Sequence, residues 1–122
     1  PMGEPLGRDI ARERVDAETI GDNWRVGGSS TWSTPSLDPA LGLLFVGTGN
    51  ASPNDVPSLR PGDNLYASSL VALDVDSGKV RWHYQQVPQD VWGYDVASAS
   101  ILFGAGRRGC RQDRLVLRSR PP

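Results

Sequence analysis

Short apolar runs alternate with turn-forming residues along most of this 122-residue chain. Residues 43–46 are apolar at every position, which predicts a strand that is buried on both faces. Two further runs, residues 69–74 and 79–85, flank the turn sequence Val-Asp-Ser-Gly at 75–78, so we expect them to pair as a hairpin. Residues 97–103 predict a last strand. Short strands separated by Gly, Pro and Asp are typical of an all-β fold.

Three segments lack this strand pattern. Residues 9–20 could form a short helix, but their apolar positions are irregularly spaced, so we interpret residues 1–22 as a connection between strand units. Residues 50–64 form a long loop, because three prolines and a glycine within them exclude regular structure. Residues 87–94 form a second loop. Loops of this length inside a domain tend to carry function.

A cluster of glycines and polar residues follows the first predicted strand. Gly47 and Gly49 let the backbone bend and let another group approach it closely. Asn50 then presents an amide oxygen, which is a hard donor suited to Ca²⁺. Trp32 adds a flat indole upstream, and residues 90–95 add two carboxylates and two aromatic rings. Together these groups could hold a planar, anionic cofactor clamped to a metal ion.

Five segments of the chain, taken together, resemble one protein family. They are PMGEP at 1–5, the interval from Trp32 to Asn50, RPGDNLY at 60–66, ALDVDSGKVRW at 72–82 and DVWGYD at 90–95. The family is that of the pyrroloquinoline quinone (PQQ)-dependent alcohol and sugar dehydrogenases, which are eight-bladed β-propellers. Residues 72–82 look like its tryptophan-docking blade motif. The resemblance implies that residues 1–106 are a partial PQQ-binding β-propeller of about two blades.

The resemblance implies roles for Trp32 and Asn50. Trp32 matches the residue that forms one face of the slot for the quinone ring, where a parallel aromatic surface gives dispersion energy. A core or interface Trp is the alternative that sequence alone favours, but the interval to Asn50 equals that of the family. Asn50 matches the metal-ligating Asn. The alternatives are a turn residue, or a glycosylation sequon with Ala51 and Ser52.

Gly93 and Asp95 bear on catalysis. The family places at Gly93 the aspartate that takes the alcohol proton as hydride leaves, so the resemblance implies that the catalytic base is absent here. Asp95 matches a carboxylate that lanthanide-using members add as a further metal ligand, and a turn or cap aspartate is an equal alternative. If residues 92–95 are extended, positions 93 and 95 lie roughly 6.6 Å apart, so Asp95 is not expected to replace the base.

The charge of the chain divides near Gly106. Six of the thirteen basic residues and one of the fourteen acidic residues lie beyond it, so residues 1–106 carry a net charge of −6 and the tail carries +5. The tail has no lysine and no interleaved aromatic residues, so we expect no nucleic-acid partner. Cys110 is the only cysteine, which excludes an internal disulfide.

The basic tail, residues 107–122, has no counterpart in the resembled family and no fold-like pattern. With allowed codons, residues 111–121 can be back-translated so that a start one base later reads Gly-Lys-Thr-Gly-Trp-Phe-Tyr-Val-Leu-Asp-Arg. The family places a strand of that kind after this loop. A change of reading frame is therefore one hypothesis for the irregular tail.

The resemblance implies a fragment of a periplasmic dehydrogenase that oxidises a small alcohol or sugar with PQQ and a bound Ca²⁺ or lanthanide ion. Its electron acceptor would be a cytochrome c or a quinone. Because of Gly93, we expect the chain to be inactive alone. One alternative is a non-catalytic propeller scaffold, which Gly93 favours and the Asn50 cluster disfavours. The other is a truncated reading frame with no function of its own.

Overall fold

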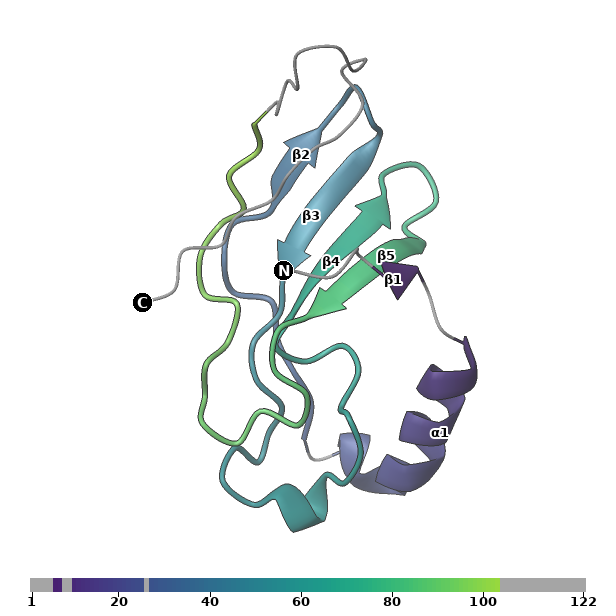
Figure 1. Cartoon of the computed structure of the whole chain (residues 1–122), viewed down its shortest axis with the longest axis vertical. Helices are drawn as coiled ribbons and strands as arrows, with labels where there is room; N and C mark the ends of the chain where they lie inside the picture. The colour runs from purple at the N-terminus through teal and green to yellow at the C-terminus, as the bar shows by residue number, and fades with distance from the viewer. Residues whose placement is uncertain (1–5, 8–9, 26, 104–122) are drawn as a thin grey trace.

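An antiparallel sheet of five strands forms the centre of the structure (Figure 1). This computed structural model describes residues 6–7, 10–25 and 27–103. The elements are β1 (Leu6–Gly7), α1 (Ile10–Ile20), η1 (Gly21–Arg25), β2 (Ser36–Asp38), β3 (Leu43–Gly47), η2 (Pro57–Leu59), β4 (Ser69–Asp74) and β5 (Val80–Gln85). The strand order is β1-β5-β4-β3-β2. The strands predicted at 43–46, 69–74 and 79–85 are confirmed as β3, β4 and β5.

The pairing register brings the ends of three strands together. Gly47 pairs with Leu70, and Ser69 pairs with Gln85. The chain therefore leaves β3, enters β4 and leaves β5 at the same end of the sheet. In Figure 1 the long loops gather at this lower end, and α1 lies beside them. This end of the sheet is where the candidate polar residues lie.

Phe45 of β3 and Leu70 and Ala72 of β4 form the buried core. The rings of Phe45 and Trp82 lie 5.7 Å apart between centroids at an interplanar angle of 49°, so β5 packs on the same core. An aromatic pair in such a tilted arrangement contributes about 0.5–1.5 kcal/mol beyond its buried area. Within the apolar run of β3, Phe45 is buried, while Leu43, Leu44 and Val46 are half-buried, so the strand is covered only in part.

The predicted hairpin turn at 75–78 joins β4 to β5. Asp74 Oδ1 accepts hydrogen bonds from the Ser77 hydroxyl at 2.8 Å and from the Ser77 N–H at 2.9 Å. Gly78 has a φ of +68°, which glycine adopts without steric cost. These hydrogen bonds from Ser77, with a smaller contribution from Arg81, hold the pKa of Asp74 below its ordinary value of 3.8.

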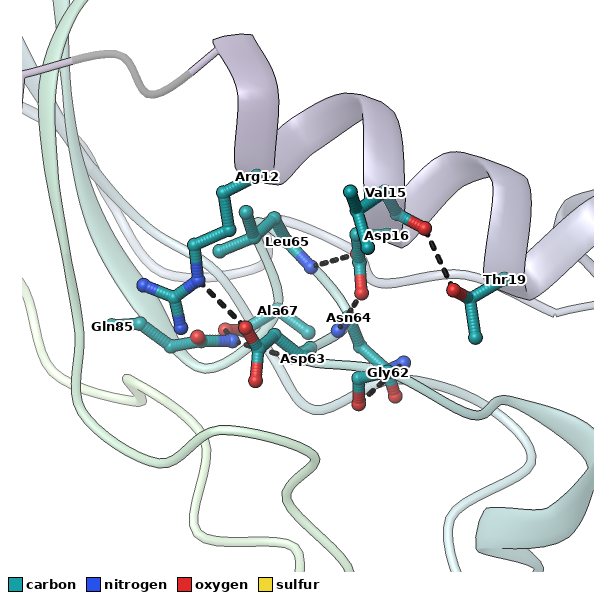
Figure 2. A network of polar contacts seen from close by, with 10 residues as sticks. All are labelled: Arg12, Val15, Asp16, Thr19, Gly62, Asp63, Asn64, Leu65, Ala67 and Gln85. Atoms are coloured by element: carbon teal, nitrogen blue, oxygen red, sulfur yellow. Dashed lines mark hydrogen bonds and ion pairs between the residues drawn. The ribbon is translucent and has the colours of Figure 1, made fainter.

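Helix α1 shows that the short helix considered for residues 9–20 does form, within the segment interpreted as a connection between strand units. Polar contacts dock it (Figure 2): Asp16 accepts hydrogen bonds from the N–H groups of Asn64 at 2.9 Å and Leu65 at 2.7 Å. Arg12 pairs with Asp63 at 2.6 Å. The helix buries a carboxylate rather than an apolar stripe, so its hydrophobic periodicity is weak. No helix in the described part of the chain is long and apolar enough to cross a membrane.

The strand predicted at 97–103 is wrong. This segment follows the open side of β2 and β3 without forming a strand of its own. It makes single contacts there, such as the hydrogen bond from the Ser36 hydroxyl to the Ser100 carbonyl. Residues 97–100 are Ala and Ser, whose small side chains offer little area to bury. The basic tail and residues 1–5 lie outside the described residues.

Candidate functional site

A cavity of about 510 Å³ opens at the end of the sheet where β3 stops. It brings together the three residues singled out from the sequence, Trp32, Asn50 and Asp95, from three separate segments. The other lining residues are small or polar: Gly27, Gly28, Ser29, Ser30, Gly49, Ser52 and Asn54. The cavity therefore combines one aromatic face with amide, hydroxyl and carboxylate groups.

The two glycines after β3 are needed for close approach rather than for unusual φ angles. A Cβ on Gly47 would lie 2.6 Å from the carbonyl oxygen of Val96, which no side chain could tolerate. A Cβ on Gly49 would lie 3.0 Å from Asp95 Oδ1 and 3.2 Å from Trp32 Nε1. The missing side chain at Gly49 thus leaves room for the indole and the carboxylate to meet over the backbone.

Asn50 sits between this backbone turn and Asp95. Its main-chain N–H donates a hydrogen bond to Asp95 Oδ1. Its side-chain Nδ2 is buried and has no hydrogen-bond partner among the residues described. A buried polar atom without a partner is costly, and it commonly marks a place for a ligand. The amide nitrogen and oxygen are interchangeable by rotation, so the same position suits an oxygen ligand to a cation.

Asp95 adopts a left-handed backbone conformation, with a φ of +54°. Such a conformation costs about 1–2 kcal/mol in a residue with a side chain, although Asp tolerates it better than most. Strained residues of this kind gather at functional sites when the surrounding structure holds them in place. Its carboxylate points at the Asn50 turn through Oδ1, which supports its selection as a candidate ligand.

Asp90 holds the segment that carries Asp95, and sequence reasoning assigned no role to it. The side chain is 1% exposed. Oδ1 accepts the N–H groups of Trp92 at 2.9 Å and Gly93 at 3.0 Å, and Oδ2 accepts Ser68 Oγ at 2.8 Å, the Tyr94 N–H at 2.9 Å and the Asp95 N–H at 3.3 Å. Burial alone would raise the pKa of Asp90, but these hydrogen bonds outweigh it and hold the pKa below 3.8.

The turn around Gly93 replaces the extended geometry considered for residues 92–95. Gly93 has a φ of +71°, and consecutive N–H groups converge on one carboxylate, so the estimate of roughly 6.6 Å for two strand steps does not apply here. A Cβ on Gly93 would meet no atom within 4 Å. Position 93 has space for a side chain, and this chain has none there.

The aromatic residues divide between core and cavity. Trp32 is 58% exposed at the cavity and is absent from the hydrophobic core. Trp82 packs on Phe45, as expected for a residue that holds strands together. Trp92 is 78% exposed in this structure. His83 is buried with its ring 4.6 Å from that of Tyr66, away from the cavity residues.

The metal-binding groups that this chain supplies are few. Within residues 6–7, 10–25 and 27–103, no group of three or more His, Cys, Asp or Glu side chains could hold a metal ion. Asn50 and Asp95 offer one amide and one carboxylate, both hard oxygen donors of the type that Ca²⁺ takes in sets of six to eight. These two residues fit part of a calcium or lanthanide site.

Most of the chain is similar in sequence to known dehydrogenases. The family model "PQQ: Glucose/ethanol/alcohol dehydrogenase, beta-propeller domain" matches residues 8–120. The chain is 45% identical over 101 residues to the quinoprotein alcohol dehydrogenase PedH of Pseudomonas putida, covering 83% of this chain and 17% of PedH. It is 38% identical over 101 residues to the lanthanide-dependent methanol dehydrogenase of Methylorubrum extorquens, covering 83% and 16%.

The fold of the chain also matches a solved structure of this kind of dehydrogenase. The quinohemoprotein alcohol dehydrogenase from Comamonas testosteroni matches 90% of this chain and 17% of its own, with a TM-score of 0.72 and 39% sequence identity. The five-stranded sheet is therefore part of a β-propeller, as the sequence predicted. The chain spans about one sixth of the length of these relatives.

Proposed function

The chain belongs to the β-propeller family of PQQ-dependent glucose, ethanol and alcohol dehydrogenases, and from this we propose that it forms part of an enzyme that oxidises a small alcohol or sugar. The observation that carries the proposal is the meeting of Trp32, Asn50 and Asp95 at one cavity. Similarity to PedH and to a lanthanide-dependent methanol dehydrogenase supports the choice of an alcohol substrate.

In this proposal each cavity residue has one role. Trp32 forms one face of the cofactor slot, because its exposed indole can stack on a planar ring. Asn50 and Asp95 bind a Ca²⁺ or lanthanide ion through their side-chain oxygens. When bound, PQQ would supply the two-electron oxidant for the alcohol, and the metal ion would supply a Lewis acid. Further ligands come from outside this chain.

The proton of the alcohol lacks an acceptor at position 93. Gly93 has no side chain, and the Asp95 carboxylate is already engaged by the Asn50 N–H. We therefore propose that the chain contributes the cofactor face and the metal ligands but not the general base. A well-placed base contributes about 10²–10⁴ in rate, so an enzyme assembled around this segment would be slow.

The remaining assignments also rest on the family. We propose a cytochrome c or a quinone as electron acceptor and a periplasmic location. We propose that residues 1–106 constitute the propeller segment and residues 107–122 a tail, although the family model that matches the chain runs on to residue 120. A change of reading frame in this tail stays a hypothesis that genomic sequencing would test.

A protein-binding scaffold is the second candidate, and Gly93 is the observation that favours it. A scaffold has no need of a base, so the loss of that side chain would carry no cost. The buried, unpartnered Nδ2 of Asn50 argues against a scaffold, because a module without a ligand gains nothing from that cost.

Metal and cofactor content would test the proposal. Residues 27–103 would replace the matching segment of the Comamonas testosteroni enzyme, giving a protein that we call the Comamonas chimera. We expect the chimera to retain one PQQ and one metal ion per chain, measured by absorbance and mass spectrometry. Asn50→Ala and Asp95→Asn should each lower metal content, while Asn54→Ala at the cavity rim should not. Equal metal content in all four proteins would refute the proposed ligands.

A further inference from the structure

The Asp90 carboxylate has an unusual set of partners for a fully buried acid. It accepts five hydrogen bonds, four of them from consecutive backbone N–H groups at 92–95 and one from Ser68 Oγ. Hydrogen bonds to a charged acceptor are stronger than those between neutral groups when they are well formed. The turn at 92–95 is therefore built around one side chain.

This turn includes conformations that need such support. Gly93 and Asp95 both have positive φ angles, of +71° and +54°, and Gln89 just before Asp90 has one of +47°. A non-glycine residue adopts this region less readily than the right-handed conformation, because its Cβ crowds the following carbonyl oxygen. The N–H groups of residues 92–95 converge on the carboxylate only in this strained form. Without the Asp90 carboxylate, these N–H groups lose their acceptor, and we expect residues 92–95 to leave this backbone conformation.

The backbone of Asp90 is held as firmly as its side chain. Arg60 is 3% exposed, and its Nη2 donates to the carbonyl oxygens of Asp90 and Asn54, both at 2.5 Å. Its Nε donates to the Pro53 carbonyl at 2.7 Å, and its Nη1 to Asn64 Oδ1 at 2.7 Å. One guanidinium thus ties the loop that follows Asn50 to the loop that carries Asp95.

The two loops meet again at the cavity. The Asp95 carboxylate accepts the Asn50 N–H, so the amide and the carboxylate that we assign to the metal are fixed relative to each other. The hydrogen bonds to Asp90 fix the backbone conformation of Asp95. Arg60 fixes the position of Asp90 relative to the loop that follows Asn50. A shift of Asp90 would be passed to Asp95 through a single hydrogen-bonded turn.

We propose that Asp90 is a positioning residue that sets the Asp95 carboxylate against Asn50 and so completes the metal-binding geometry. The inference rests on the proposed function for the metal, but its structural part, the dependence of the turn at 92–95 on Asp90, stands by itself. Residues that orient a metal ligand commonly change metal affinity by 10–100-fold when they are replaced.

The first measurement is amide hydrogen exchange in the full 122-residue chain. Asp90→Asn has the same shape but supplies one acceptor oxygen fewer, so we expect exchange at residues 92–95 to accelerate at least about tenfold. Asp74→Asn is the matched control, because Asp74 also accepts hydrogen bonds within a turn but lies in the β4–β5 hairpin. The control should leave residues 92–95 protected.

The second measurement is Tb³⁺ binding, followed by luminescence lifetimes in H₂O and D₂O that count the waters on the ion. We expect Asp90→Asn to weaken Tb³⁺ binding at least about tenfold and to add bound water where Asp95 has withdrawn. Asp74→Asn should change neither value. If Asp90 stabilises the turn without positioning Asp95, its replacement should leave both the Tb³⁺ affinity and the number of bound waters unchanged.

The outcomes separate this inference from the proposed function. Because the isolated chain supplies only two ligands, Tb³⁺ binding is measured in the Comamonas chimera. If the chimera fails to bind Tb³⁺, the proposed metal site fails, and the exchange data still decide whether Asp90 holds the turn. If the chimera binds Tb³⁺ and its Asp90→Asn variant binds it equally with the same hydration, the inference is overturned. If the core strands of the isolated chain exchange without protection, the same variants are compared in the Comamonas chimera. Loss of protection at 92–95 there, with weakened Tb³⁺ binding, supports the inference.

Discussion

At the scale of single residues, the proposed chemistry depends on Gly93. Its position in the turn is fixed by the hydrogen bond from its N–H to Asp90 Oδ1 at 3.0 Å. A Cβ there would enter open space, so the lack of a side chain reflects the residue itself and not a steric demand of the neighbours. The backbone conformation, with a φ of +71°, suits glycine but is also accessible to Asp and Asn.

Restoring an aspartate at this position should restore turnover. In the Comamonas chimera with saturating PQQ and metal, we expect Gly93→Asp to raise kcat at least about a hundredfold, because a carboxylate can then take the alcohol proton. Gly93→Asn is the control, since it has the same size and the same backbone cost but no base. Equal kcat for the chimera and for Gly93→Asp would mean that another group acts as base.

The Asp74 turn offers a test of the electrostatics away from the cavity. Its folded-state pKa lies below the unfolded value, so its contribution to stability is present above about pH 4 and is lost as the pH falls through the folded-state pKa. Ser77→Ala removes the hydroxyl donor and should raise the pKa of Asp74 toward 3.8, as measured by carboxyl carbon chemical shifts. An unchanged pKa would show that the Ser77 hydroxyl does not stabilise the carboxylate.

The residues of the candidate site differ in how far the sequence could predict them. Trp32 and Asn50 were accessible because their interval matches that of a family, and the structure brings them to one cavity. The role of Asp90 could not be predicted from the sequence, since it depends on a turn that brings four N–H groups onto one carboxylate. The sequence does hold a weak signal, because an Asp three residues before a Gly is typical of a side-chain-capped turn.

At the scale of elements, the central strands could be predicted from the local sequence, but the helix could not. β3, β4 and β5 could be predicted, because apolar runs and a Val-Asp-Ser-Gly turn encode them locally. Helix α1 could not, because Val15 is exposed while Asp16 is buried against the 62–65 loop. Its position depends on contacts with residues about fifty positions away, which periodicity does not report.

Removing the docking carboxylate of α1 should destabilise the fold. We expect Asp16→Ala to lower the free energy of unfolding by about 2–3 kcal/mol, because the N–H groups of Asn64 and Leu65 lose their acceptor. Glu18→Ala on the same helix removes only an exposed pair with Arg14 and should cost less than about 0.5 kcal/mol. Urea unfolding of the 122-residue chain measures both, because the chimera does not include α1, and equal effects would show that α1 is not docked through Asp16.

At the scale of the whole molecule, the sheet is one part of a larger ring. The chain covers 17% of the Comamonas testosteroni enzyme, and its sheet ends in β2 on one side and β1 on the other. Trp32 and Trp92 are exposed at the end of the sheet that bears the cavity. A slot for a planar cofactor needs walls on both faces, and in the proposed function this segment supplies one of them.

The isolated chain should therefore bind PQQ weakly. Binding sites of this kind commonly bury most of the ligand surface, and here only the Trp32 face is available for stacking. We expect a dissociation constant weaker than about micromolar, measured by quenching of tryptophan fluorescence, with Trp32→Ala as the control for the stacked ring. Micromolar or tighter binding that Trp32→Ala abolishes would show that the segment forms a complete slot.

The most direct test of the account is the position of the metal ion. Crystals of the Comamonas chimera grown with PQQ and Eu³⁺ would show the ion by anomalous diffraction. We predict one peak about 2.3–2.6 Å from a side-chain oxygen of Asn50 and from one of Asp95. That peak should vanish or shift in Asp95→Asn. A peak with no contact to either residue, at full PQQ occupancy, would contradict the assignment of this cavity as the metal and cofactor site.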